Sequence, residues 1–436
     1  MTFPPALREP RFRSMWAAGL ISDAGDWMLL VALPIFVYEL TGSALGTSAA
    51  FLAELAPSAL LSPLGGWLAD RTDRRQLMLA VTAAQAVALL PLLLVHDRHG
   101  LAIVYAVIVV EASLAAIFDP ARSALLPTLI AARSDLVSAN SLIALGTGIA
   151  RLAGGPLGGL LLAAGSLHTI VIADALSFGL AAILIGRLDP GRPAAAMVGG
   201  ATAVEVTHPP APAAQVQSDR PTIRAALGLA FVAQVAQGIF VVLFVVFVAR
   251  RLHGGPAEIG LLRGIQAVGG IAAGAILALR TSRGSPGELA ARCLLAFGAI
   301  SLVVWNAPAL STAPVLFLAL FIVIGAPGVG FEAGLTSTLQ LAAAGHERGR
   351  AFGALGFAGA AGQALGMAIA GLLTPWLGLM AVLQFQGGLY VSAGLVAAVA
   401  VRGRRRALAS SGDARSRSGL SARGRRRTRL AGHDRA

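Results

Sequence analysis

Apolar segments long enough to cross a lipid bilayer recur along the whole chain of 436 residues. A membrane-spanning helix needs about 20 mostly apolar residues, and a helix satisfies its own backbone hydrogen bonds in lipid. Only 13% of the residues are charged, about half the share that a soluble protein carries. We therefore predict an all-α integral membrane protein with twelve transmembrane helices. The expected spans are 14–38, 43–69, 76–96, 101–120, 137–164, 168–187, 224–250, 257–279, 288–307, 312–343, 350–375 and 378–401.

The spans form two groups of six, separated by a polar segment rich in proline and alanine whose composition is typical of a linker. A faint internal repeat relates the turn after the second span to the turn after the eighth, where Arg280 and Arg283 take the places of Arg71 and Arg74. Repeated halves are typical of secondary transporters. We expect an N-terminal six-helix bundle (1–187), a cytoplasmic linker (188–223), a C-terminal six-helix bundle (224–402) and a disordered basic tail (403–436).

The distribution of positive charge predicts how the chain is oriented in the membrane. All 34 basic side chains are arginines, and the net charge is +13. Cytoplasmic loops carry an excess of such residues. With a cytoplasmic N-terminus, nearly all loop arginines and the tail fall on the cytoplasmic side, and the exceptions are Arg98, Arg250 and Arg251. We therefore expect both termini in the cytoplasm, a location in the plasma membrane, and a tail that contacts anionic lipid rather than nucleic acid.

The turn between the second and third spans combines glycine, acid and arginine. It reads Gly65-Gly66-Trp67-Leu68-Ala69-Asp70-Arg71-Thr72-Asp73-Arg74-Arg75 and resembles the signature loop of the major facilitator superfamily, with Asp73 in place of a second glycine. Glycine allows a neighbouring helix to approach, and an acid can pair with arginines or with a helix N-terminus. The resemblance implies the major facilitator fold and a conformational latch; the alternative is a plain topology signal. The latch candidates are Gly66, Asp70, Arg71, Arg74 and Arg75.

Further segments resemble one group within this superfamily, the bacterial exporters of the enterobactin and macrolide-efflux type. These segments are 7–13, 22–27, 38–43, 119–127 and 139–142. The run 154–159 (Gly-Gly-Pro-Leu-Gly-Gly) resembles a Gly-Pro motif of superfamily exporters, although close helix packing also explains it. Arg151 stands where that motif has its upstream glycine. Gly155, Pro156, Asp119 and Arg122 are therefore candidates for a gate or a structural role.

Ionisable side chains at membrane depth are costly and are candidates for function. At about 1.5 Å of rise per residue, Asp26, Glu54, Glu111 and Arg151 come out near the midplane, with Glu332 nearer the cytoplasmic side. In the superfamily, spans one, four, seven and ten line the central cavity, so the resemblance implies that Asp26, Glu111, Asp119 and Glu332 lie on cavity-lining spans. We expect Asp26, Glu54, Glu111, Arg151 and Glu332 to form a cavity for protons and substrate.

Glu111 is our preferred proton carrier, because it interrupts an otherwise apolar run and a buried carboxyl group readily holds a proton. Asp26 is its competitor, and Arg151 is the natural opposite charge. The alternative for each acid is an ion pair or helix cap that never changes its protonation. We prefer this structural interpretation for Asp119, Asp174 and other charged residues nearer the span ends.

Patterns for catalysis and for metal binding are missing from the sequence. The single Cys293 excludes an intramolecular disulfide framework and a multi-cysteine metal site, and neither a P-loop nor a nucleophile elbow occurs. We expect no catalytic residue, cofactor, metal or nucleic-acid partner. Our interpretation is a monomeric secondary transporter that exports a small amphipathic or hydrophobic compound, drug- or siderophore-like, by proton-driven alternating access. The alternatives are an uptake permease or lipid flippase of the same fold and, in another class, a non-transporting receptor or scaffold.

Overall fold

The computed structural model describes residues 5–130, 136–165, 167–188, 218–279, 285–343 and 347–403. Three of the features discussed above therefore lie wholly or mostly outside the described residues. These are the predicted linker over 188–223, the basic tail over 403–436, and the second copy of the repeated turn with Arg280 and Arg283.

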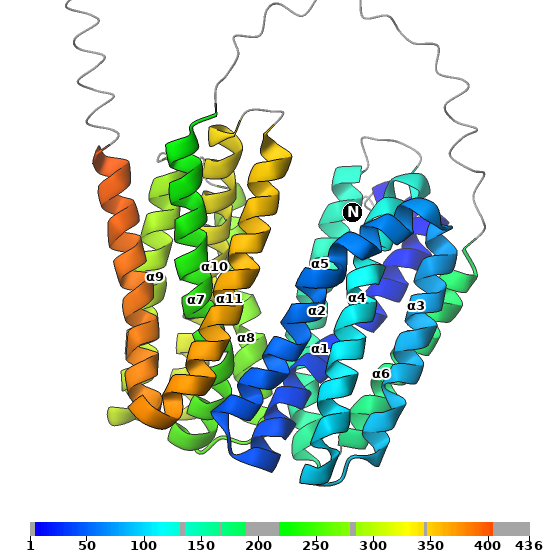
Figure 1. The fold of residues 1–436 in the computed structure, drawn as a ribbon, viewed down its shortest axis with the longest axis horizontal. Coiled ribbons are helices and arrows are strands. Elements are labelled where there is room, and N and C mark those ends of the chain that lie inside the picture. Colours follow the sequence, from blue (N-terminus) through cyan, green and yellow to red (C-terminus); the bar gives the residue numbers. More distant parts are fainter. Residues whose placement is uncertain are drawn as a thin grey trace, which may run out of the picture.

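Within the described ranges all regular secondary structure is helical, and twelve helices are long and apolar enough to cross a membrane. This confirms the predicted fold class. The first half contains α1 (Pro10–Thr41), α2 (Ala44–Arg71), α3 (Arg74–Ala88), α4 (Leu101–Leu129), α5 (Leu136–Ala163) and α6 (Leu167–Gly186). The second half contains α7 (Arg220–Arg251), α8 (Pro256–Leu279), α9 (Pro286–Asn306), α10 (Pro314–Ala342), α11 (Arg348–Leu377) and a last helix, Leu379–Gly403, unlabelled in Figure 1. Short 3₁₀ turns lie at Pro5–Arg8, Leu90–Leu94, Arg98–Gly100 and Ala307–Ala309.

Local sequence signals set several helix ends. Gly42 ends α1 with a φ of 62°, in the left-handed region that favours glycine. The Ser43 side chain then caps α2 by accepting a hydrogen bond of 3.3 Å from the backbone N–H of Gly46. Asp219 caps α7 in the same way, so this helix begins at Arg220, inside the segment predicted to be the linker.

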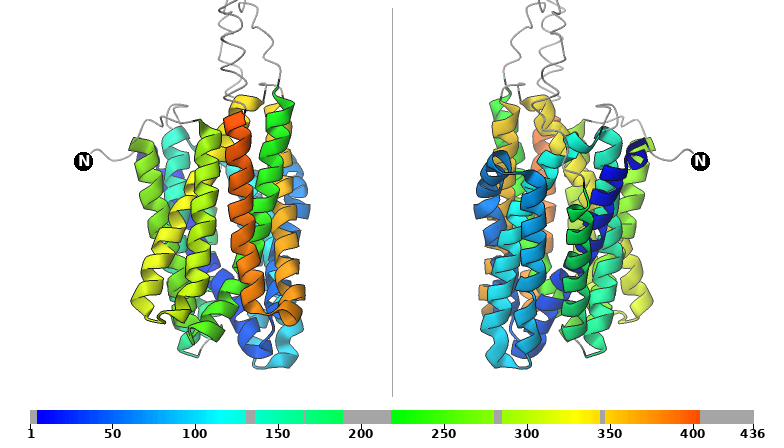
Figure 2. Two further views of the ribbon diagram at one scale, coloured as in Figure 1. Left: turned by 90° about the vertical axis from the view of Figure 1, so that its left-hand side faces the viewer. Right: turned by 90° about the vertical axis from the view of Figure 1, so that its right-hand side faces the viewer.

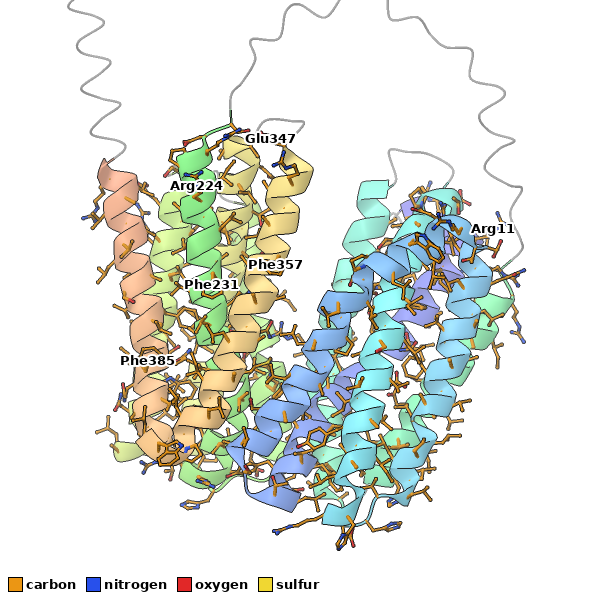
Figure 3. All side chains as sticks on the ribbon, in the orientation of Figure 1. Arg11, Arg224, Phe231, Glu347, Phe357 and Phe385 are labelled. Atoms are coloured by element: carbon orange, nitrogen blue, oxygen red, sulfur yellow. The ribbon has the colours of Figure 1, made fainter. Side chains whose placement is uncertain are left out.

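The helices form two bundles, α1–α6 and α7 to the last helix, which stand side by side (Figure 1). The bundles meet at one end, which we call the closed end, and diverge toward the end that carries the N-terminus, which we call the open end. Views from both sides show the helices running along one common direction (Figure 2). Across the interface, α5 packs against α8 and α2 packs against α11. Arg11, Arg224 and Glu347 lie at the open end (Figure 3).

Glycines let α5 and α8 approach each other near the closed end. A Cβ atom added at Gly159 would lie 2.4 Å from the carbonyl oxygen of Pro256, and one at Gly260 would lie 2.5 Å from that of Gly155. Pro156 packs against α8 in the same region. Such contacts between membrane helices require residues without bulky side chains. The structure therefore places Gly155 and Pro156 in the interface between the bundles.

Among the described residues, helix α7 is the most buried of the twelve spans. Its phenylalanines build an aromatic core: the ring of Phe247 lies 4.8 Å from that of Trp305, and the ring of Phe244 lies 5.3 Å from that of Phe321. Offset and edge-on ring contacts of this kind stabilise a core beyond simple burial. The second bundle thus has an aromatic core centred on α7.

Candidate functional site

A cavity of about 860 Å³, which we call the wide cavity, lies between α5 and the inner face of the second bundle. Side-chain amides dominate its polar lining, from Gln234, Gln237, Gln266 and Gln363. The Tyr390 hydroxyl, which also lines it, donates a hydrogen bond of 3.0 Å to Gln237 Oε1. Amides both donate and accept hydrogen bonds, so this wall can hold polar groups of many kinds.

A second cavity, of about 220 Å³, lies within the first bundle and is lined by four carboxyl groups. We call it the acidic cavity; its acids are Asp26, Glu54, Glu111 and Asp174. Gln85 donates a hydrogen bond of 3.2 Å to Glu111 Oε2, while Glu111 Oε1 is buried without a hydrogen-bond partner among the described residues. The structure therefore brings together three of the acids that we predicted at the midplane.

The sequence did not lead us to place Asp174 of α6 in this cavity, because its position favours a structural role. Its side chain is fully buried, and its Oδ1 accepts a hydrogen bond of 3.0 Å from Ser177. Its Oδ2 has no partner within the described part of the chain. A Cβ atom on Gly25 would lie only 1.9 Å from Asp174 Oδ1. A glycine opposite the acid on α1 thus makes room for it.

Asp119 and Arg122, our candidates for a gate or a structural role, form an ion-pair cluster with α1. Arg122 lies 3.1 Å from Asp119 and 3.5 Å from Asp23. The Thr147 hydroxyl of α5 donates a hydrogen bond of 3.0 Å to the other Asp23 oxygen. The cluster ties three helices of the first bundle together. This geometry favours the structural interpretation of both residues.

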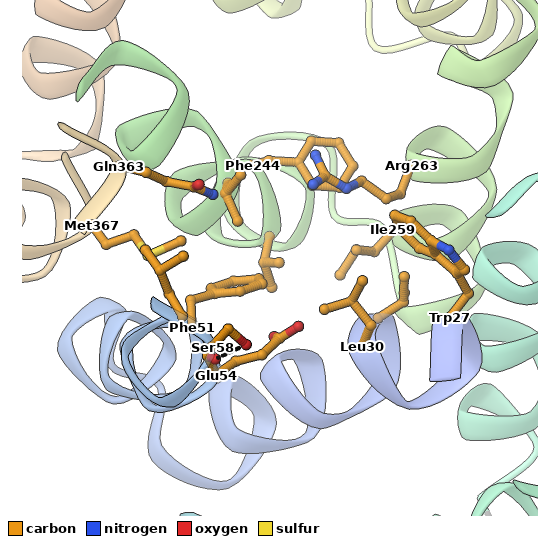
Figure 4. A pocket seen from close by; sticks show the side chains of 14 residues that line it. Trp27, Leu30, Phe51, Glu54, Ser58, Phe244, Ile259, Arg263, Gln363 and Met367 are labelled. Atoms are coloured by element: carbon orange, nitrogen blue, oxygen red, sulfur yellow. Dashed lines mark hydrogen bonds between the residues drawn. The ribbon is translucent and has the colours of Figure 1, made fainter. Parts of the chain in front are cut away.

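A third cavity, of about 280 Å³, lies where the two bundles meet, and we call it the apex cavity. Glu54 of α2 and Arg263 of α8 occupy opposite walls of it (Figure 4). Trp27 lines both the apex cavity and the acidic cavity, so the two adjoin. Arg263 was absent from our predicted site. Its position in the internal repeat, equivalent to Glu54, could have indicated it.

Arg151 and Glu332, which we expected in one cavity with the acids, line the wide cavity instead. The Arg151 guanidinium carbon lies 5.5 Å from the centroid of the Trp27 ring, a cation–π distance. Its Nε atom is buried without a hydrogen-bond partner in the described residues. Over the same residues no ion pair joins Arg151 to Asp26 or Glu111. In this state, therefore, the expected opposite charge does not neutralise the acids.

The signature loop (residues 65–75) lies at the open end of the first bundle. Arg74 donates a hydrogen bond of 3.0 Å to the carbonyl oxygen of Ala124, and Arg75 donates to the carbonyl oxygens of Ile185 and Gly186. Both arginines thus bind helix ends of their own bundle. The structure also places the other latch candidates of this loop. Arg71 stacks on the ring of Trp67 at 4.2 Å, Gly66 leaves open space where a side chain would stand, and Asp70 is exposed with no ion pair to any described residue.

Comparison with known proteins agrees with this architecture. The profile of the family described as Major Facilitator Superfamily matches residues 15–228. The chain is 25% identical over 414 residues to the uncharacterized MFS-type transporter YfiS of Bacillus subtilis, covering 89% of this chain and 94% of that protein. It is 28% identical over 392 residues to the multidrug efflux pump Tap of Mycolicibacterium fortuitum, covering 86% and 91%.

Solved structures of low sequence identity share the fold. A bacterial homologue of the iron transporter ferroportin in its inward-facing state superposes with a TM-score of 0.69 at 19% identity, over 89% of this chain and 97% of that one. A crystal structure of the peptide transporter POT superposes with a TM-score of 0.67 at 14% identity, over 90% and 94%. With the twelve helices and these relatives, the chain belongs to the major facilitator superfamily, as a multi-pass transporter of the plasma membrane rather than an enzyme.

Proposed function

We propose that this transporter exports a small amphipathic or hydrophobic compound, drug- or siderophore-like, and that protons drive the export. The acidic cavity carries the proposal. Asp26, Glu111 and Asp174 line it together, and none of them forms an ion pair with a described residue. Carboxyl groups that line one small cavity repel each other when ionised, which favours proton uptake. The similarity to an efflux pump supports the direction of transport.

Alternating access follows from the shape of the two bundles. They meet at the end where α1 finishes and diverge at the end where it begins (Figure 1). The arginine distribution predicts that the open end faces the cytoplasm. This state would then take up substrate from the cytoplasm through the wide cavity. Rocking of one bundle against the other would release it on the opposite side.

Glu111→Gln tests the proton step, because it keeps the shape of the side chain and removes its titratable group. In reconstituted vesicles, gradient-driven export should fail and lose its pH dependence, while downhill exchange of substrate should survive. Glu39→Gln is the matched control, because Glu39 is an exposed acid of α1 outside these cavities. If Glu111→Gln keeps uphill export and Asp26→Asn abolishes it, Asp26 is the carrier.

Other outcomes separate the alternatives. Normal export by both variants would refute proton coupling through these acids and favour a uniporter or a flippase. Accumulation in the opposite direction would identify an uptake permease. A protein that moves none of a panel of drug-like and siderophore-like compounds in either direction would fit a receptor or scaffold.

A further inference from the structure

The apex cavity presents two opposite charges, one from each bundle. Figure 4 shows the Glu54 carboxylate and the Arg263 guanidinium on facing walls, with the cavity between them. No ion pair joins the two groups or links either of them to another residue of the described ranges. Both residues are half-buried, and Arg263 contacts the Phe240 ring at 5.6 Å, which leaves its charge without an acid partner among the described residues. A charge removed from water is unfavourable unless an opposite charge compensates it. Each of the two groups is therefore available to a partner that enters the cavity.

The internal repeat relates the two positions. Arg71 and Arg280 are paired by the repeat, and the same sequence offset pairs Glu54 with Arg263. Helices α2 and α8 are thus equivalent elements, both of which begin at the closed end. Repeats of this kind are related by an axis along the membrane normal, so equivalent residues lie at similar depth on opposite sides of it. The repeat therefore carries a negative charge on one side and a positive charge on the other.

The surface between the two charges is mainly apolar. It is formed by Phe51 of α2, Phe244 of α7, Ile259 of α8 and Met367 of α11, with Trp27 of α1 beside them. Polar groups here are few: Ser58, whose hydroxyl already donates to the Glu54 backbone carbonyl, and Gln363. The cavity volume of about 280 Å³ is near the lower limit of ligand pockets, about 300 Å³. The cavity suits a small ligand with an apolar body.

We propose that the apex cavity binds a zwitterionic amphiphile, with its ammonium group toward Glu54, its carboxylate toward Arg263 and its apolar body between them. This rests on the proposed export function and names the class of substrate. An arginine fork matches a carboxylate in geometry, and charge-assisted hydrogen bonds are the stronger ones. Because each bundle supplies one charge, the bound ligand joins the bundles. Its binding thereby favours one relative arrangement of them over the other.

A small apolar dipeptide and its blocked forms test this assignment. The probes are leucyl-leucine, its N-acetyl form without the ammonium group, and its amide without the carboxylate. Binding is measured as ligand-induced thermal stabilisation of the full chain in lipid nanodiscs. We expect the wild-type protein to bind the free dipeptide at least about tenfold more tightly than either blocked form, since a hydrogen bond to a charged group contributes about that factor or more.

Each of two variants should lose one part of this preference: one variant the discrimination against the acetylated peptide, the other the discrimination against the amide. Glu54→Gln should bind the free and the acetylated peptide equally and still reject the amide. Arg263→Gln should bind the free acid and the amide equally and still reject the acetylated form. Glu39→Gln and Arg98→Gln make the same chemical changes at exposed positions and should keep the full preference. A merely structural role of the two residues would weaken binding of all three probes alike.

The outcomes separate this inference from the proposed function. If the wild-type protein binds the free dipeptide no better than its blocked forms, the zwitterion assignment is wrong, whether or not the variants fold. Gradient-driven export of a hydrophobic cation such as tetraphenylphosphonium, without that preference, would overturn the inference and leave export intact. The full crossed pattern of binding without any gradient-driven export would support the zwitterion site and refute the export.

Discussion

A small residue on the neighbouring helix makes room for the buried acid Asp174 in the first bundle. Asp174 is fully buried and lies directly against Gly25 of α1. In the sequence, Asp174 stands near the start of an apolar span, where a structural role is the simplest interpretation. Only the packing of α1 against α6 brings it into the same cavity as Asp26 and Glu111. A glycine in one helix thus decides the surroundings of an acid in another.

Gly25→Ala tests this contact. The added methyl group would lie 1.9 Å from Asp174 Oδ1, so α1 or the acid must move. Overpacking of this kind costs about 1–3 kcal/mol. We expect a lower melting temperature in detergent and a marked loss of gradient-driven export. Gly179→Ala is the matched control, because nothing lies within 4 Å of a Cβ atom at that position of α6. Equal melting temperatures for the two variants would contradict the proposed contact.

The ends of α1 and α7 are joined across the two bundles at the closed end. Arg250 Nε donates a hydrogen bond of 2.7 Å to the Tyr38 hydroxyl, and its Nη2 donates one of 2.9 Å to the carbonyl oxygen of Gly42. A cation is favourable at the C-terminal end of a helix such as α1. Arg250 was an exception to the predicted charge asymmetry. Its contacts supply a reason for its place, because it holds the bundles together on that side.

Arg250→Ala should weaken the closed end. It removes two hydrogen bonds from a charged donor, each worth about 1.5–3 kcal/mol, so the population open at this end should rise at least about tenfold. Tyr38→Phe removes one of the two and should have a smaller effect. The measurement is the distance between spin labels at positions 98 and 310, which lie in exposed turns at the closed ends of the two bundles. The native Cys293 is replaced by serine so that only these two positions are labelled. Arg251→Ala, at the exposed neighbouring position, should leave the distances unchanged; a shift as large as that of Arg250→Ala would refute the assignment.

The whole molecule is open at one end, and the signature loop lies on that side. Arg74 and Arg75 are held by carbonyl oxygens of α4 and α6, whereas Asp70 is exposed without an ion pair to any described residue. Asp70 is therefore an exposed acid of the loop that is available to the second bundle when this end closes. A contact made in one state and absent in the other biases the equilibrium between them.

Asp70→Asn keeps the shape of the side chain and removes its charge. We expect transport to slow by about tenfold, which corresponds to 1.4 kcal/mol between the two states. Substrate affinity in the state open at the signature loop should change little, because no residue of the loop lines the three cavities described above. The measurements are the initial transport rate in vesicles and equilibrium binding in nanodiscs. A normal rate would show that the loop is only a topology signal.

The sequence by itself determined the class of the protein, its twelve helices and its membership of the superfamily. Long apolar segments decide this locally, because a backbone in lipid must satisfy its own hydrogen bonds as helices. The depth of Asp26, Glu54 and Glu111 also follows from counting along a helix. The identity of the side chain that faces each of these acids cannot be derived from the sequence in this way. It depends on the rotation and tilt of helices that are distant in the chain.

Tertiary structure alone decided which charges meet. It placed Asp174 with the predicted acids, moved Arg151 into the wide cavity, and set Arg263 opposite Glu54 at the junction of the bundles. It also joined Arg250 to the end of α1. These contacts arise because glycines allow particular helix faces to approach closely, and the sequence of a single helix does not specify which face its partner presents.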